Sequence, residues 1–183
     1  GAVLAVKGIG GYHLMCDARS APAVAQSRAR KQRPDKPLAV MYPRSRGGAD
    51  PLACLRDDVV LTDPEAAALL SAVRPIVVAR RAAGCTLAPG IAPGLDEIGV
   101  LLPYSPLHEM LLGDFGGPLV ATSGNLSGEP VITDPAMAQS RLAGLVDAFL
   151  HHDRPICRPA DDPVCRELAG RIRPIRLGRG SAP

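Results

Sequence analysis

The sequence predicts an α/β fold built on a mixed β-sheet, and three observations support this class. Short apolar runs alternate along the chain with segments that open with helix-capping residues, which is the pattern of alternating strands and helices. The 19 glycines and 19 prolines predict tight turns between these elements. A chain of 183 residues, 46% of them hydrophobic, is long enough and apolar enough to bury the core of one domain.

The predicted strands share a short apolar core that is bounded by glycine, proline or polar residues. They span residues 2–6, 38–41, 76–79, 98–102, 119–121, 148–150, 155–157 and a basic terminal segment at 171–180. Because helical segments separate most of these runs, the sheet is expected to contain both parallel and antiparallel pairs.

The predicted helices are marked by the polar residues that precede them. The first is capped by Asp17 or Ser20 and runs to about Arg30. The segment at 62–65, Thr-Asp-Pro-Glu, is a capping signature for a helix at 66–73. Further helices are predicted at 50–57, 106–112 and 135–145, the last two after a Ser-Pro or Asp-Pro pair.

The composition excludes several classes of function. No apolar run approaches the roughly 20 residues that a membrane helix needs. The five cysteines are scattered without a Cys-x-x-Cys pair, which argues against a zinc site or a disulfide framework and fits a reducing cytosol. A formal charge of +3 is too small to require a nucleic-acid partner. The chain starts without a basic leader or a methionine, so we expect a cytoplasmic protein that is a fragment of a longer one.

The segment at 118–130 has the strongest local signal of a ligand site. Its apolar run ends in hydroxyl and amide side chains with glycines among them, namely Thr122, Ser123, Gly124, Asn125, Ser127 and Gly128. Open α/β sheets form a ligand crevice where buried strands end in such groups, because the glycines let a ligand approach the backbone. From these residues alone, an ordinary turn after a strand is the alternative.

Two cationic motifs in the first 36 residues indicate an anionic ligand. Only three of the 21 basic residues are lysines, and all three, Lys7, Lys31 and Lys36, lie in these motifs. Lys7 opens a glycine-rich turn at 7–13 whose N–H groups can bind a phosphate or carboxylate; a hairpin is the alternative. Lys31 and Arg33 flank a proline-stiffened corner, although cations at a helix end also stabilise the helix dipole.

The motifs Lys31-Gln-Arg33 and Ser123-Gly-Asn125 resemble the KxR and SxN signature of the YrdC-like domains, which include the threonylcarbamoyl-adenylate synthases of tRNA modification. Within this superfamily the sequence is similar to the HypF carbamoyltransferases of nickel–iron hydrogenase maturation. The matching phrases span most of the chain: KGIGGYHLMCDA, RARKQRPDKPLAVM, LAPGIAPGLDEIGVLLPYSPLHEMLL, PLVATSGNLSGEP and FLHHDRPI. Free-standing synthases have a pattern resembling P-T-E/D-T-V-Y-G in place of the turn at 7–13, which favours the hydrogenase branch.

The resemblance implies a single YrdC-like domain over residues 1–183, with a twisted mixed sheet and flanking helices around a concave basic cavity. It implies that the domain uses ATP with Mg²⁺ to convert carbamate, derived from carbamoyl phosphate, into carbamoyl-AMP and pyrophosphate. The carbamoyl group would supply the cyanide ligand of the hydrogenase. The implied partners are the other HypF domains of a longer chain and HypE, the carbamoyl acceptor, with no membrane and no nucleic acid.

The resemblance also implies roles for particular residues. Catalysis is assigned to Lys7, Lys31 and Arg33. Nucleotide binding is assigned to Lys31, Arg33, Thr122, Ser123, Asn125, Arg176 and Arg179, and carbamoyl binding to Gly8, Tyr12 and His13. No residue is assigned as a metal ligand.

Two departures from the family pattern leave alternatives open. Pro163 stands where the family resembles a serine, and Ser181 stands where it resembles a tyrosine. A degenerate domain that binds nucleotide without turnover is therefore one alternative, and a free-standing threonylcarbamoyl-adenylate synthase is a second. A double-stranded RNA-binding module is a third, which the scarcity of aromatic side chains and the lack of tryptophan disfavour.

Overall fold

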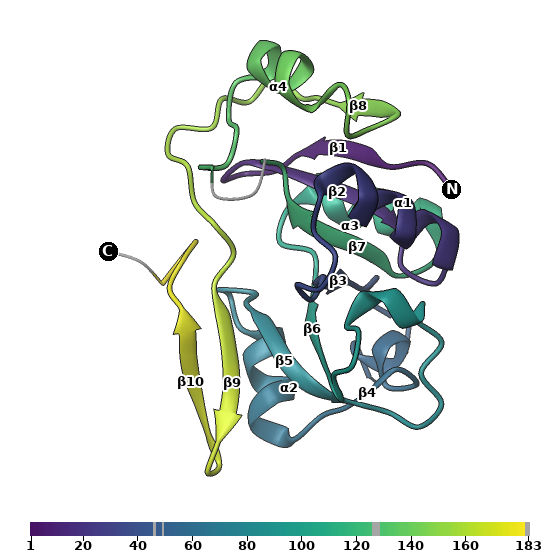
Figure 1. Ribbon diagram of the computed structural model, residues 1–183. Helices are drawn as coiled ribbons and strands as arrows, with labels where there is room; N and C mark the ends of the chain where they lie inside the picture. The colour runs from purple at the N-terminus through teal and green to yellow at the C-terminus, as the bar shows by residue number, and fades with distance from the viewer. Residues whose placement is uncertain (46, 49, 126–128, 182–183) are drawn as a thin grey trace.

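The computed structural model describes residues 1–45, 47–48, 50–125 and 129–181. Within these ranges the chain forms one mixed sheet of ten strands with four α-helices (Figure 1). The strands are β1 (Leu4–Lys7), β2 (Tyr12–Asp17), β3 (Val40–Met41), β4 (Val59–Val60), β5 (Ile76–Arg81), β6 (Glu97–Leu101), β7 (Leu119–Ser123), β8 (Ala148–Leu150), β9 (Val164–Leu168) and β10 (Arg171–Arg176). The α-helices are α1 (Ala21–Lys31), α2 (Asp63–Leu70), α3 (Pro106–Phe115) and α4 (Pro135–Leu142).

The strand order is β10-β9-β5-β6-β3-β7-β2-β1-β8, with β4 paired to β5 outside this path. The pairs β1–β8, β3–β6 and β5–β9 are parallel, and the remaining pairs are antiparallel. Figure 1 shows β1, β2 and β7 in the upper part of the molecule and β5, β6, β9 and β10 in the lower part, with the two-residue β3 between them. The predicted α/β class with a mixed sheet is confirmed.

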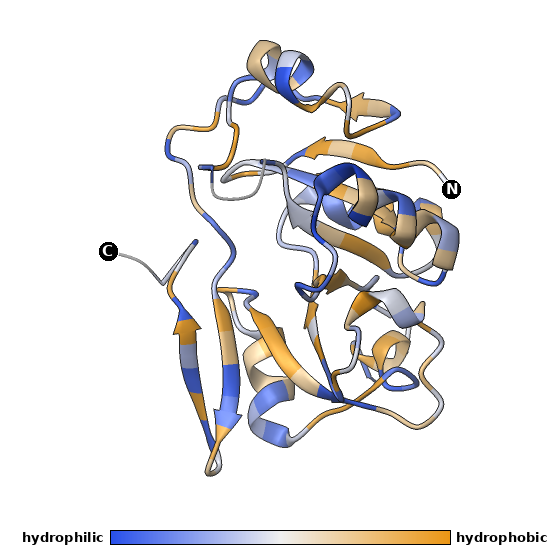
Figure 2. Ribbon diagram, in the orientation of Figure 1, coloured by the Kyte–Doolittle hydropathy of each residue, from blue (hydrophilic) through white to orange (hydrophobic). Residues whose placement is uncertain are grey.

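The core consists of two clusters of buried apolar side chains. The larger cluster includes Val24 of α1, Leu69 of α2 and Leu142 of α4. The smaller one gathers side chains such as Met15 and Leu101 with Leu112 of α3. Figure 2 shows the matching pattern, with hydrophobic residues concentrated in the strands. Each fully buried aliphatic side chain stabilises the fold by about 1.5–3 kcal/mol relative to an exposed one, so these clusters hold the helices on the sheet.

The predicted helix starts are confirmed by side-chain caps. The side chains of Ser20, Thr62, Ser105 and Asp134 each accept a hydrogen bond from the backbone of the helix that follows. At α2, Glu65 completes a capping box with Thr62. No helix among the described residues is long and apolar enough to span a bilayer.

Some predicted elements are wrong or were missed. Residues 50–57 contain only a short 3₁₀ turn, Ala53–Leu55, and residues 155–157 form no strand. Strands β2, β4 and β9 were not predicted from the sequence. The turn at 7–13 joins the paired strands β1 and β2, and the Gly8 N–H donates to the Gly11 carbonyl at 2.8 Å. It is therefore a β-hairpin, which was the alternative to an anion-binding turn.

Gly124 sets the direction of the chain after β7. Its N–H donates to the Tyr12 carbonyl of β2 at 2.6 Å. A Cβ at this position would lie 2.6 Å from Tyr12 Cβ and 2.8 Å from its carbonyl oxygen, so only glycine lets the two backbones approach this closely. The contact between Tyr12 and Gly124 therefore fixes the position of the chain directly after β7.

We expect Gly124→Ala to lower the free energy of unfolding by about 1–3 kcal/mol, because the added methyl group must push one strand away from the other. Chemical denaturation measures this loss. Gly144→Ala is the matched control, since no atom lies within 4 Å of the added Cβ, and it should change stability by less than about 0.5 kcal/mol. Equal stabilities of the two variants would contradict this account of the β2–β7 contact.

Candidate functional site

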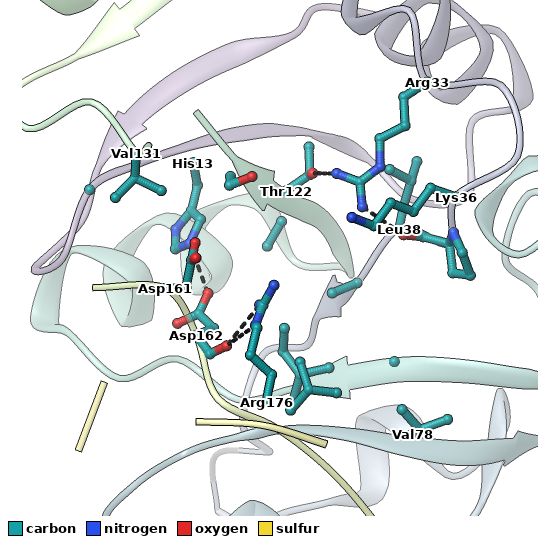
Figure 3. A pocket seen from close by; sticks show the side chains of 18 of the residues that line it. His13, Arg33, Lys36, Leu38, Val78, Thr122, Val131, Asp161, Asp162 and Arg176 are labelled. Atoms are coloured by element: carbon teal, nitrogen blue, oxygen red, sulfur yellow. Dashed lines mark hydrogen bonds and ion pairs between the residues drawn. The ribbon is translucent and has the colours of Figure 1, made fainter. Parts of the chain in front are cut away.

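A cavity of about 440 Å³ opens between the upper and lower parts of the sheet, within the size range of small-molecule sites. Its apolar side chains include Ile76 and Val78 of β5, Ala121 of β7, Val164 of β9 and Ala39, which precedes β3. Arg33, Lys36 and Thr122 lie along one side, and His13, Asp161 and Asp162 lie across from them (Figure 3). The cavity therefore combines an apolar surface with cationic and hydroxyl groups.

The Lys31 ammonium connects the end of α1 to the last residues of β7 and to Asn125 after it. It donates to the Ser123 carbonyl at short range, and to Asn125 Oδ1 at 3.3 Å and Ser123 Oγ at 3.4 Å. Thr122 Oγ1 lies 3.5 Å away, and Ser123 Oγ in turn donates to Asn125 Oδ1 at 2.7 Å. The two motifs that the sequence singled out thus meet at one point, 92 residues apart in the chain.

Burial changes the acid–base behaviour of Lys31. The side chain is 3% exposed, and burial lowers the pKa of its ammonium to about 7, with the nearby charges of Arg33 and Lys36 acting in the same direction. The oxygens around the ammonium replace part of its hydration, and the charge of Asp161 acts to raise the pKa. Lys31 can therefore change its protonation when an anion arrives near neutral pH.

Arg33 extends the cluster into the cavity. Its Nη1 donates to Thr122 Oγ1 at 3.2 Å (Figure 3), while its Nε is buried without a hydrogen-bond partner among the described residues. Burial lowers the pKa of its guanidinium, and the charges of Arg28 and Arg176 add to that effect. An incompletely satisfied guanidinium on a cavity wall is suited to bind an anionic oxygen.

Arg28 supports this wall and was missed by the sequence analysis. Its guanidinium donates to the carbonyls of Arg33 and Pro34 at 2.8 Å each and to that of Lys36 at 3.1 Å, and it also bonds the carbonyls of Gly90 and Ile91. Five backbone acceptors around one buried arginine hold the corner after α1 in place. The arginine-rich run at 28–33 did signal this residue, but only as a cation at a helix end.

The two C-terminal arginines, Arg176 and Arg179, have different positions and contacts. Arg176 lines the cavity and donates to the Asp162 carbonyl at 2.8 and 3.2 Å. Arg179 is absent from the lining: it pairs with Asp162 Oδ1 at 3.2 Å, donates to the Val73 and Arg74 carbonyls, and lies 3.5 Å from the centre of the Tyr104 ring. The Arg179 guanidinium is therefore bonded within the protein, and its nucleotide-binding role stays a prediction.

Only some residues of the glycine-rich hairpin line the cavity. Tyr12 and His13 line the cavity, whereas Lys7 and Gly8 are absent from its lining. The Lys7 ammonium is buried and donates to the His152 carbonyl at 2.9 Å. Tyr12 donates or accepts at His151 Nδ1, 2.6 Å away, and burial raises the pKa of its hydroxyl to about 12. The structure thus does not bring Lys7 to Lys31 and Arg33, and its catalytic role stays a prediction.

The cavity lining contains charged side chains of both signs. The lining contains the cations Arg33, Lys36, Arg166 and Arg176 and the carboxylates Glu97, Asp161 and Asp162. Arg166 is paired with Glu97, and Asp162 is paired with His13 and Arg179. The lining cations that form no ion pair among the described residues are Arg33 and Lys36 on one side and Arg176 on the other. No cluster of three metal-binding side chains occurs in the described ranges, while Ser127 and Gly128 of the predicted site lie outside them.

Comparison with known proteins shows the family of the chain. The family model described as telomere recombination, which groups the Sua5, YciO and YrdC proteins, matches residues 1–178, so the chain belongs to this family. Over its full length the chain is 44% identical to the carbamoyltransferase HypF of Synechocystis and 47% identical to that of Rhodobacter capsulatus. It spans 23% of the length of each of these relatives.

Solved structures give the same relationship. A full-length HypF in its phosphate- and nucleotide-bound form superposes with a TM-score of 0.91 at 40% identity, over 98% of this chain and 27% of that one. Sua5 of P. abyssi complexed with L-threonine superposes with a TM-score of 0.77 at 20% identity, over 97% of this chain and 50% of that one. The second likeness shows the shared fold alone.

We expect Arg179→Met to lower the free energy of unfolding by about 3 kcal/mol at neutral pH, because it removes a partner from a buried carboxylate. Although burial acts to raise the pKa of Asp162, His13 and Arg179 outweigh it and hold that pKa well below its usual value. The stability from this pairing is therefore present above about pH 4 and is lost as the pH falls further, so the difference between wild type and variant should shrink there.

Arg176→Met is the comparison for this prediction, because the Arg176 side chain is exposed and its bonds go to one backbone carbonyl. It should cost less than about 1 kcal/mol. Thermal and urea denaturation from about pH 7 down to pH 3 measures both variants. A larger loss for Arg176→Met than for Arg179→Met would show that the two roles are assigned the wrong way round.

Proposed function

We propose that this chain binds ATP in the cavity and adenylates carbamate, forming carbamoyl-AMP and pyrophosphate. The observation on which the proposal rests is the meeting of Lys31 and Arg33 with Thr122, Ser123 and Asn125 beside a cavity of nucleotide size. The 44–47% identity to HypF carbamoyltransferases over the whole chain supports this assignment within the family. The chain spans 23% of the length of each of these relatives, so their full reaction is proposed only for the longer proteins.

The lining suits the parts of ATP. Ile76, Val78 and Ala121 offer apolar surface to an adenine ring, while Arg33 and Lys36 offer positive charge to a triphosphate. Mg²⁺ in phosphate-transfer sites keeps several waters and takes its other oxygens from the phosphates and one or two carboxylates. Asp161 is the lining carboxylate that makes no ion pair among the described residues, and we assign it to hold Mg²⁺ with the nucleotide.

The chemistry that we propose needs no general base, because a carbamate oxygen is already anionic. That oxygen forms a bond to the α-phosphorus of ATP as the bond to the β-phosphate oxygen breaks, and pyrophosphate leaves with the electron pair. The protein must hold two anions in line and stabilise the charge that grows on the leaving group. Lys31 and Arg33 supply that charge, and the Ser123–Asn125 segment supplies neutral hydrogen-bonding groups.

In the longer proteins that the chain resembles, we propose that other domains supply carbamate from carbamoyl phosphate and pass the carbamoyl group on. The acceptor would be a thiol of HypE, and the product would become the cyanide ligand of a nickel–iron hydrogenase. The isolated chain should then bind ATP yet carbamoylate no thiol when it is given carbamoyl phosphate. Carbamate added directly should still reach the cavity and react.

A threonylcarbamoyl-adenylate synthase is the second candidate, because the chain shares its fold with a Sua5 that was solved with L-threonine. Pyrophosphate exchange into ATP separates the two candidates. With Mg²⁺, ammonium carbamate should drive exchange of labelled pyrophosphate, and bicarbonate with threonine should not. Arg33→Met should reduce the exchange by at least about 10-fold, the effect of losing a charge-assisted hydrogen bond. Exchange that requires threonine would overturn the proposal in favour of the synthase.

The pKa of Lys31 generates a separate prediction about ATP binding. At about pH 8 the Lys31 amine of the free chain is mostly neutral, and a bound polyphosphate favours its charged form, so binding should take up a proton. Because this uptake becomes costly as the pH rises, ATP affinity should fall between about pH 7 and pH 9. Calorimetry in buffers of different ionisation enthalpy measures the proton directly.

Lys31→Met should bind ATP more weakly and lose this proton uptake, because the titrating amine is gone. Lys36→Met is the matched control, since it removes an ammonium that lines the cavity beside Lys31 and should keep the uptake. If Lys31→Met retains the uptake of the wild type, the proton does not go to Lys31 and the assignment of this amine to the phosphates is wrong.

A further inference from the structure

Asp162 lies where three parts of the chain meet at the edge of the cavity. Its Oδ2 lies 3.0 Å from His13 Nε2 of β2, and its Oδ1 lies 3.2 Å from Arg179 Nη2 in the segment after β10. Its backbone carbonyl accepts two hydrogen bonds from Arg176 of β10 (Figure 3). One residue of the linker between β8 and β9 thus contacts each of these elements.

The surroundings of Asp162 keep its carboxylate charged. Its side chain is 9% exposed, and Arg179 opposite is 12% exposed, so solvent screens their attraction weakly. The rings of Tyr104 and His108 complete the enclosure: their centroids are 4.8 Å apart, and each ring packs against His13. Burial lowers the pKa of His108 to about 3, so this neighbour is neutral and adds no competing charge near neutral pH.

The carboxylate determines what His13 presents to its surroundings. An ionised carboxylate only accepts hydrogen bonds, so the His13 nitrogen that faces Asp162, Nε2, must be the one with the proton. In a neutral ring the other nitrogen, Nδ1, is then an acceptor. The Tyr104 hydroxyl lies 3.5 Å from Nδ1 and His13 lines the cavity, so Asp162 sets the hydrogen-bonding character that this ring presents to Tyr104 and to a bound molecule.

The backbone carbonyl of Asp162 orients the Arg176 guanidinium. Arg176 Nη2 and Nε both donate to the Asp162 carbonyl, which leaves Nη1 without a hydrogen bond among the described residues. Arg176 also lines the cavity. The segment that contains Asp162 is held in its turn, because Ala160 N–H donates to the Gly10 carbonyl at 2.9 Å and Arg179 N–H donates to the Asp161 carbonyl at 2.8 Å.

We propose that Asp162 is a positioning residue for the reaction in this cavity: its side chain fixes the orientation and tautomer of His13, and its backbone aims Arg176. Arg176 thereby donates to the anionic oxygen of a carbamate, and His13 Nδ1 accepts from the carbamate N–H, on the side of the cavity opposite Lys31. This inference rests on the proposed function for the identity of the substrate, but the His13–Asp162 geometry can be tested without any substrate.

The first test is the tautomer of His13 in the ligand-free chain. Long-range ¹H–¹⁵N NMR distinguishes protonated from unprotonated ring nitrogens, and a His13→Gln variant assigns the signals. With the ring neutral, wild-type His13 should carry its proton on Nε2, and Asp162→Asn should give a mixture of both tautomers. Asp153→Asn, an exposed residue of the same linker, is the matched control and should leave the signals unchanged. A wild-type proton on Nδ1 would overturn the proposal even if Asp162→Asn fails to fold.

The second test is pyrophosphate exchange driven by ammonium carbamate. Asp162→Asn should lower the rate of exchange at limiting carbamate by at least about 10-fold, the loss of one charge-assisted interaction, while ATP affinity changes by less than about 3-fold. A parallel loss of ATP affinity, or an unchanged exchange rate, would contradict a positioning role at the acyl side. Failure of the wild type to exchange would count against the proposed function instead, and the NMR result would still stand on its own.

Discussion

The burial of the Lys31 ammonium is the constraint on which the candidate site depends. Removing an ammonium from water costs free energy unless oxygens replace its hydration shell. Here those oxygens come from Thr122, Ser123 and Asn125, so the loop after β7 must lie against the end of α1. The same burial lowers the pKa of Lys31 to about 7, which keeps the amine responsive to an arriving anion.

Two further buried charged residues, Arg28 and Asp162, hold the chain segments on either side of this contact. Arg28 gathers the carbonyls of the corner after α1, and Asp162 joins β2 to the segment around β10. Both use buried charge-assisted hydrogen bonds, which are stronger and more directional than neutral ones. A cavity built this way is largely organised before a ligand enters, and preorganisation is what a reaction that depends on positioning and charge requires.

The fold could be predicted in outline because its local signals are consistent with it. Ser20, Thr62 and Asp134 cap the helices that the sequence placed after them, and these bonds involve residues only three positions apart. The strands β2 and β9 escaped prediction for a different reason. β2 is buried along nearly its whole length, so it lacks the alternation of a half-exposed strand, and β9 is recognisable mainly by its pairing with β5 and β10.

By itself the sequence determined the chemical character of the site, because the cations of the Lys31–Arg33 motif and the oxygens of the Ser123–Asn125 motif are fixed by residue type and local turns. Only the tertiary structure decided which cations lie at the site. Arg33 lines the cavity and Lys31 lies beside it, both bonded to oxygens of the 122–125 segment, whereas Lys7 and Arg179 bond to carbonyls elsewhere, and Arg179 also to a carboxylate. The carbonyl partners lie 105 to 145 residues away in the sequence, so no local pattern indicates them, and the environment of a charge is set by what surrounds it in space.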